Sequence, residues 1–223
     1  MDAPGHNAIL DLVRTAAPRG EVVDLPLLKD HLRVTGSTEF DLTIARNLEA
    51  AVSDLDGPLG YLGRCLLEQS FTLYLERFPH AGWHYREGWH WRELPLPLPP
   101  LLAVDSIGYL DATGAQQTLD PSLYVDITGP RASVKLRPGN DWPATDGSPR
   151  AVQIAFRCGY APKNEAGVSN GLDVPAGIRQ ALMLMVGDYF ENREAVVVAE
   201  SRVTQILNPT ADNLLRKHCA SWL

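Results

Sequence analysis

Histidine is the residue type in this sequence with the clearest chemical potential, because three of its six copies fall in one short stretch. His80, His84 and His90 lie there, and imidazole nitrogens are common ligands of zinc and related metals. His80 and His84 would share one face of a helix, but Pro79 and Gly82 disfavour a helix at this place. No cysteine or carboxylate completes an obvious ligand set. A metal-dependent hydrolase is therefore an open alternative, and no metal site is predicted.

Other patterns that support catalysis or metal binding are missing or incomplete. The sequence has no GxxxxGK phosphate-binding loop, no GxGxxG dinucleotide fingerprint and no HExxH zinc motif. Asp54 and Asp56 are two positions apart, but the ligand spacing of a calcium loop does not continue past them. Cys65, Cys158 and Cys219 are too far apart for a CxxC motif and odd in number, so we expect free thiols in a reducing compartment. We predict neither enzymatic activity nor a cofactor.

Composition and charge limit the partners that the chain can bind. The 223 residues are 45% hydrophobic and 21% charged, as in ordinary globular proteins. The formal net charge is -7 and the pI is about 5.3. Arg131, Lys135 and Arg137 form the densest basic stretch and alternate with apolar residues, as on the exposed face of a strand, so no DNA-binding patch is predicted. No signal peptide or membrane-length apolar run is found, so we expect a soluble protein made in the cytoplasm, with no membrane partner.

Tryptophans crowd the same loop as the histidines. Trp83, Trp89 and Trp91 fall within residues 79–93. Aromatic side chains of this kind are enriched at the buried centres of protein interfaces, which makes the loop a candidate contact with a neighbouring subunit or a tail-side protein. The three side chains could equally fold back on their own sheet. The sequence leaves both interpretations open.

Two helices are expected before this loop, after a loosely ordered arm at residues 1–23 in which residues 9–13 could make a helical turn. Asp24 and Pro26 are typical of the start of a first helix. A second helix is predicted to start at Thr38, with Asp41 three positions on in an arrangement like a capping box. Apolar residues then recur at helical spacing: Phe40, Ile44, Leu48, Val52 and Leu55.

A block of short strands is expected from Gln69 onward, because the apolar period changes to two. The alternation of Phe71, Leu73 and Leu75 with polar residues opens this block. The proline-rich run 94–100 is predicted to be an extended edge or linker, because proline cannot donate to a sheet ladder. Further strands are predicted at 102–110, 116–119, 124–127, 134–137 and 152–158.

A strong helix is predicted after the polar loop 161–172. Asp173 is expected to cap it, with Pro175 in the first turn. Its apolar residues cover more than one side, which indicates burial on a broad face: Ile178, Ala181, Leu182, Leu184, Met185, Val186, Tyr189 and Phe190.

The last segment of the chain carries few apolar residues. Those of residues 203–223 are too sparse for an independent core, so we expect a segment that docks on its parent domain or on a neighbouring subunit. A partner-seeking role suits 210–223 better than 203–207. The candidate oligomer or portal interface comprises Ile206, Leu207, Leu214, Leu215 and Trp222.

The order of elements, helices first, then strands, then a helix, predicts the α+β class rather than a doubly wound sheet. We expect the N-terminal helical pair and the C-terminal helix to pack together, with an antiparallel β block inserted between them and an extended tail after them. The predicted divisions are an arm at 1–23, a helical domain at 24–66 and 173–202, a β subdomain at 67–160 and a docking tail at 203–223.

Six phrases in this order resemble the head–tail connector, or adaptor, family of long-tailed bacteriophages and phage-derived gene transfer agents. The resemblance covers roughly residues 22–195. The phrases are Leu28–Val34, Leu62–Leu66, Leu96–Leu101, Asp120–Tyr124, Trp142–Pro143 and Val174–Leu182 running to Tyr189–Glu194. The length of the tryptophan loop and the N-terminal arm depart from the family pattern.

The resemblance implies a structural virion protein without an active site. Subunits of this family form a twelve-fold ring beneath the portal protein and join the DNA-filled head to a tail-side connector, stopper or tail terminator protein. DNA would pass through the lumen without specific binding, which agrees with the acidic charge because such a surface supplies no counterion-release binding. The expected location is the head–tail junction of a virion or phage-like particle.

A second function class also fits the residues. The aromatic loop could belong to a tail-associated binding module that grips a carbohydrate or a receptor. This alternative requires a ligand that changes the fluorescence of the loop tryptophans, whereas the connector hypothesis requires assembly with a portal and a tail.

Overall fold

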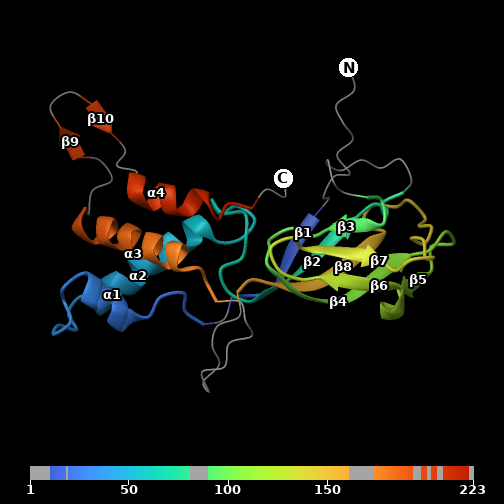
Figure 1. Ribbon diagram of the computed structural model, residues 1–223, viewed down its shortest axis with the longest axis horizontal. Helices are drawn as coiled ribbons and strands as arrows, with labels where there is room; N and C mark the ends of the chain where they lie inside the picture. The colour runs from blue at the N-terminus through green and yellow to red at the C-terminus, as the bar shows by residue number, and fades with distance from the viewer. Residues whose placement is uncertain are drawn as a thin grey trace. The chain divides into compact units, whose positions relative to one another are not determined.

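The chain folds into two compact units, a β unit and a helical unit (Figure 1). The structure is a computed structural model and describes residues 11–18, 20–80, 90–160, 173–192, 197–199, 202–204 and 208–220. The β unit holds the first strand and residues 68–160, and the helical unit holds the described residues of 20–67 and 173–220. This arrangement confirms the predicted α+β class.

A five-stranded antiparallel sheet forms the larger part of the β unit. Its strand order is β1-β2-β8-β4-β5. The strands span Asp11–Ala16 (β1), Gln69–Leu75 (β2), Val152–Cys158 (β8), Leu101–Leu110 (β4) and Gln116–Thr118 (β5).

The alternation in the sequence explains the two central strands. β2 and β8 bury every second side chain, and their register places Phe71 opposite Phe156 and Leu73 opposite Ile154. The two phenyl rings stack with centroids 6.1 Å apart. Burial on one face fixes this register, since a slip by one residue would turn the whole apolar set outward.

Strand β1 corrects the prediction of a helical turn at residues 9–13 for residues 11–13, and residues 9 and 10 lie outside the described residues. Asp11–Ala16 instead pairs with β2 at the edge of the sheet. The Arg14 guanidinium lies 5.6 Å from the centre of the Phe71 ring, and Asp11 forms an ion pair with Arg150. These long-range contacts, together with the β-branched residues Val13 and Thr15, favour a strand over an isolated helical turn.

A second antiparallel sheet has the order β3-β7-β6 and includes the proline-rich run. β3 is Glu93–Pro95, β7 is Ser133–Leu136 and β6 is Tyr124–Ile127, which follows the 3-10 turn η1 at Pro121–Leu123. The prediction of an extended edge is confirmed for residues 94–95, which lie in the edge strand β3, but the run also contributes side chains to the core. Leu94, Leu96 and Leu98 are buried.

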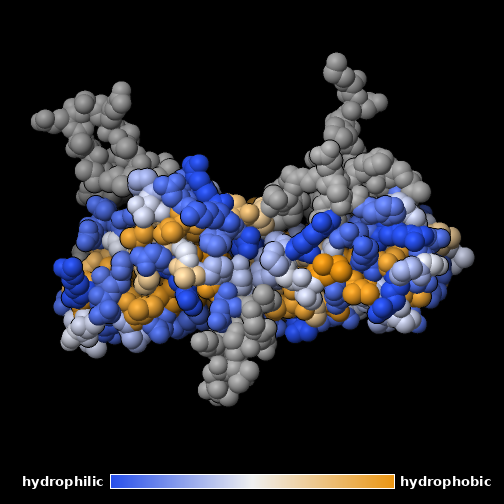
Figure 2. All heavy atoms as spheres, in the orientation of Figure 1, coloured by the Kyte–Doolittle hydropathy of each residue, from blue (hydrophilic) through white to orange (hydrophobic). Residues whose placement is uncertain are grey.

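The helical unit consists of α1 (Leu25–His31), α2 (Asp41–Leu55), α3 (Ala176–Glu191) and α4 (Pro209–Arg216). The first two helices pack with α3, as predicted, although nearly the whole β unit separates them in sequence. Their shared core includes Leu28, Ile44, Ala51, Leu55, Ile178, Ala181, Leu182 and Val186. Figure 2 shows apolar side chains on the visible face of this unit as well.

Two predicted helix caps are wrong and one is confirmed. The carboxylate of Asp24 accepts a hydrogen bond from the Leu27 amide at 2.8 Å, as an N-cap residue does. Helix α2 begins after Phe40 and α3 after Pro175, both without a side-chain cap, so neither Thr38 nor Asp173 caps a helix. Tertiary packing of their apolar faces stabilises these helices in place of a cap.

A small hairpin stands between α3 and α4. It pairs β9 (Val197–Ala199) with β10 (Arg202–Thr204) as a two-stranded sheet. No helix of the described residues is both long enough and apolar enough to cross a membrane.

Candidate interaction site

Helix α4 carries two of the five residues predicted to form an interface. Leu215 is only 5% exposed and belongs to the core of the helical unit together with Ala211, and Leu214 is partly buried against that core. This part of the tail therefore docks on its own unit. The other three residues, Ile206, Leu207 and Trp222, lie outside the residues whose side chains are described.

The sequence around α4 explains why a helix forms in a segment predicted to be extended. Asn208 is the N-cap, and its side-chain oxygen accepts hydrogen bonds from the amides of Thr210 and Ala211 at 3.1 and 3.2 Å. Pro209 occupies the first turn, where its missing N–H costs nothing. Asp212 near the start and Arg216 near the end complement the helix dipole. These start signals were present in the sequence, but only eight residues of helix follow them.

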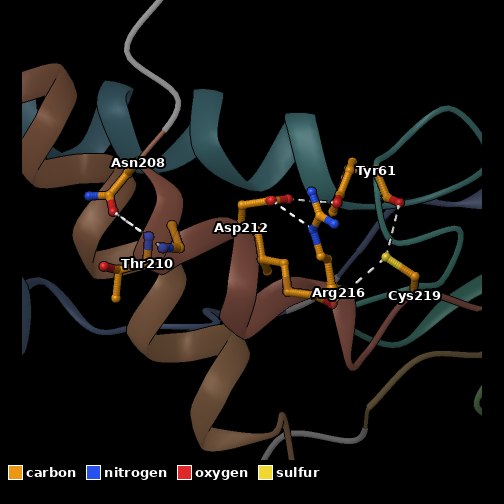
Figure 3. Close-up of polar contacts among 8 residues, drawn as sticks. Tyr61, Asn208, Thr210, Asp212, Arg216 and Cys219 are labelled. Carbon is orange, nitrogen blue, oxygen red and sulfur yellow. Dashed lines mark hydrogen bonds and ion pairs between the residues drawn. The ribbon is translucent and has the colours of Figure 1, made fainter.

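A polar network attaches α4 to the loop that follows α2 (Figure 3). The Tyr61 hydroxyl donates to Asp212 Oδ1 at 2.8 Å, and Arg216 Nε donates to Asp212 Oδ2 at 2.7 Å. The Ala220 amide donates to the Leu62 carbonyl at 2.8 Å. The Cys219 thiol lies 3.8 Å from the Tyr61 carbonyl oxygen. The network links residues about 150 positions apart, which periodicity in a sequence does not reveal.

Protonation equilibria in this network follow from its hydrogen bonds. The bond from Tyr61 and the ion pair with Arg216 lower the pKa of the Asp212 carboxyl. The same bond to Asp212 raises the pKa of the Tyr61 hydroxyl. At neutral pH the Asp212 carboxyl is therefore ionised and the Tyr61 hydroxyl is protonated, so the hydrogen bond between them is kept.

A close backbone approach positions Tyr61. The loop after α2 folds back so that the Tyr61 amide donates to the Asp54 carbonyl at 2.8 Å. A Cβ atom at Gly60 would lie 2.4 Å from the Leu55 carbonyl carbon, so only glycine fits there. The Asp56 carboxylate accepts the Leu66 amide at 2.7 Å and fixes the far side of the loop.

The aromatic side chains that flank the tryptophan loop pack within the β unit. The Phe78 and Trp142 rings stack with centroids 4.9 Å apart and an interplanar angle of 8°. Trp142 Nε1 donates to the Trp91 carbonyl at 3.0 Å, and the Arg92 guanidinium lies 4.8 Å from the Trp91 ring centre. Trp91 is half-buried here, while Trp83 and Trp89 lie outside the described residues.

The described histidines of this loop do not gather into a metal site. His80 and His90 are exposed, and His90 Nδ1 accepts the Arg92 amide at 3.3 Å. His84 lies outside the described residues. Within the described part of the chain, no group of three or more His, Cys, Asp or Glu side chains could hold a metal ion. Cys65, Cys158 and Cys219, all described, form no disulfide.

One serine of the sequence, Ser169, stands between two glycines at the GxSxG spacing. Gly167, Ser169 and Gly171 have the GxSxG spacing of a nucleophile elbow and also lie outside the described residues. An elbow places the serine directly between a strand and a helix.

Comparison with known proteins shows a similarity of fold to solved structures, but no match to a protein family. No family model matches the sequence. No curated protein matches it either.

Chains similar to this one occur in solved structures of gene transfer agent particles. A chain in the virion of a native gene transfer agent (GTA) particle has a TM-score of 0.63 and 19% identity, over 92% of this chain and 93% of that chain. A chain in the neck of an empty GTA particle computed with C6 symmetry has a TM-score of 0.63 and 19% identity, over 93% and 94%. A chain in the neck of a native GTA particle computed with C12 symmetry has a TM-score of 0.57 and 18% identity, over 92% and 94%. At these identities the similarity shows a common fold across both units.

Proposed function

We propose that this protein is a structural subunit of the neck of a phage-like particle, a head–tail connector that joins a DNA-filled head to a tail. The observation that carries this proposal is the fold similarity to GTA virion and neck chains, which extends over more than nine-tenths of the chain. A similarity of that extent includes the β unit and the helical unit in the same order. The role is structural and requires no active site.

The assembled form in this proposal is a closed ring. Two of the similar chains come from necks computed with C6 and C12 symmetry, which supports a ring of twelve copies beneath a portal protein. A net charge of -7 on each subunit suits a channel through which DNA passes without specific binding. A tail-side connector, stopper or terminator protein would cover the opposite face.

The proposed contacts with other proteins lie in the tail and the tryptophan loop. Leu215 already contributes to the core of its own unit, so the portal contact falls to Ile206, Leu207 and Trp222. Trp83 and Trp89 are the proposed contact residues of the aromatic loop, because Trp91 is held within the β unit.

Electron microscopy of particles from a producing strain that lacks this gene tests the proposal. We expect filled heads and separate tails, and restored joining when the gene is supplied again. A gold-labelled tag on the supplied protein should mark the neck. Joined particles in normal proportion, or a label that marks another part of the particle, would contradict the proposed function.

A further inference from the structure

The C-terminal end of α4 meets the first turn of α3 through a histidine. The His218 amide donates to the Leu215 carbonyl at 2.8 Å, which places this residue just past the last turn of α4. A Cβ atom at Gly177 would lie 3.0 Å from His218 Nε2 and 3.6 Å from its Cδ2. The half-buried imidazole therefore lies directly against the α3 backbone, at a position where the absence of a side chain leaves room for it.

The part of α3 that meets this imidazole carries a partial positive charge. α3 begins at Ala176 with no side-chain cap and with no acidic residue in its first turn. The amide groups of a first turn give the N-terminus of a helix its positive end, and here no carboxylate of that turn offsets it. A neutral imidazole can pack at this place, whereas an imidazolium would meet a charge of its own sign.

The charged side chains that act on His218 are positive as well. Arg64 belongs to the loop after α2, and Lys217 directly precedes His218 at the end of α4. Burial of the ring, and then the charges of Arg64 and Lys217, lower the pKa of the imidazole. The loop, α3 and α4 thus all disfavour the protonated form of His218.

The start and the end of α4 are attached by separate contacts. At the start, the Asn208 side-chain amide donates to Asp188 Oδ2 of α3 at 3.0 Å. Beyond the end, the Ala220 amide donates to the Leu62 carbonyl at 2.8 Å. Loss of the His218 contact would therefore loosen residues 217–220 while the start of α4 stays attached.

We propose that the contact between His218 and Gly177 is an acid-sensitive latch, which holds the end of α4 on α3 while the imidazole is neutral and opens when the imidazole takes up a proton. A detached His218 has the ordinary pKa of 6.5, whereas the packed ring resists protonation. The latch therefore contributes its full stability above pH 6.5 and loses it as the pH falls below that value.

The latch does not depend on the proposed function, but it adds a consequence to it. Mild acid would act on the end of the chain, where the portal contact is proposed, while the rest of the helical unit stays folded.

Amide hydrogen exchange of the full chain, followed by NMR from about pH 7.5 to about pH 5, tests the latch. After correction for the intrinsic pH dependence of exchange, protection of the Ala220 amide should fall in acid. The loss should be roughly tenfold for each pKa unit by which packing lowers the pKa of His218. The Ile44 amide, which donates to the Phe40 carbonyl at 2.9 Å, reports the whole unit and should stay protected. An equal loss at Ile44, or no loss at Ala220, would overturn the proposal.

Two histidine variants assign the effect to one residue. His218→Gln cannot take up a proton, so protection of the Ala220 amide should no longer depend on pH. His31→Gln is the matched control, because His31 is also close to a glycine of α3, with Nε2 3.8 Å from a Cβ atom at Gly187, but is exposed and far from the first turn. Its acid response should equal that of the wild-type protein. A response that persists in His218→Gln would contradict the latch.

A third variant leaves the packing untouched. Lys217 is exposed, so Lys217→Gln removes a positive charge beside His218 without removing a buried contact. NMR titration of the imidazole should give a wild-type midpoint below 6.5 and a midpoint closer to 6.5 in the variant. A wild-type midpoint at or above 6.5, or a lower midpoint in the variant, would overturn the proposal. These measurements use the isolated protein, so their failure is distinct from a failure of the proposed function in particles.

Discussion

Leu215 is a buried core residue, although it lies in a segment with few apolar residues. It is 5% exposed and belongs, with Ala211, to a core that also includes buried residues of α1, α2 and α3. The neighbouring Leu214 is only partly buried. The two leucines therefore provide a matched pair of the same residue type in adjacent positions.

The replacement Leu215→Ala should lower the free energy of unfolding of the helical unit by about 2–5 kcal/mol, because it leaves a cavity in a packed core. Leu214→Ala should cost clearly less. Urea unfolding followed by circular dichroism at a helical wavelength measures both. Equal losses in the two variants would show that α4 does not pack as described.

The polar contacts of individual residues show where sequence reasoning ends. Alternation predicted the buried set of β2, and helical spacing predicted Ile44 and Leu55, because both patterns are local. The hydrogen bond between Tyr61 and Asp212 joins the two sequence segments that form the helical unit. It depends on how the second segment packs against the first. No local pattern specifies such a bond, although the Asn208–Pro209 start signal could have identified the helix that carries Asp212.

At the scale of elements, the turn between β4 and β5 has a carboxylate at its centre. Asp111 Oδ1 accepts the amides of Thr113 and Ala115 at 2.9 and 3.1 Å, and Gln117 donates to Oδ2 at 2.9 Å. These bonds, that of the Thr113 hydroxyl foremost, lower the pKa of Asp111 to about 2. The Asp111 carboxylate is thus the group that stabilises this turn.

The pH dependence of this turn follows from the lowered pKa. Because the folded-state pKa is below the unfolded value of about 3.9, the carboxylate contributes stability above that value and loses it as the pH falls through about 2. We expect carbon NMR of the Asp111 carboxyl to titrate near 2. Asp111→Ala should destabilise the β unit at pH 7 but not below pH 2. A midpoint near 3.8 would contradict the hydrogen-bond pattern.

Element boundaries were predictable to different extents. Strands with strict alternation, such as Gln69–Leu75 and Val152–Cys158, were found where the period indicated. The edge strand Asp11–Ala16 and the short helix Pro209–Arg216 were not. Both elements are short and are stabilised by the sheet or helices against which they lie, so local periodicity carries little information about them.

At the scale of the whole molecule, the end of the chain divides into a folded part and a candidate contact part. Removing residues 208–223 deletes α4 and its core side chains, so the helical unit should unfold readily. Removing only residues 221–223 deletes Trp222 and leaves the described helix intact.

We expect the shorter truncation to keep the wild-type melting temperature while heads and tails separate in electron micrographs. The longer truncation should lower the melting temperature and yield little protein. Normal particles from the shorter truncation would remove Trp222 from the proposed portal contact. A lowered melting temperature in that variant would show that residues 221–223 contribute to folding instead.

The interleaving of the two units has a consequence for synthesis. Helices α1 and α2 leave the ribosome before the strands of residues 68–160, whereas α3 and α4, which cover their apolar faces, come last. The β unit can therefore fold during translation, at a stage when the apolar residues of α3 and α4 that pack with Leu28 and Ile44 have not yet been synthesised. The helical unit is complete only after α3 and α4 have been synthesised, so a nascent subunit cannot present a finished helical surface to its neighbours before that point.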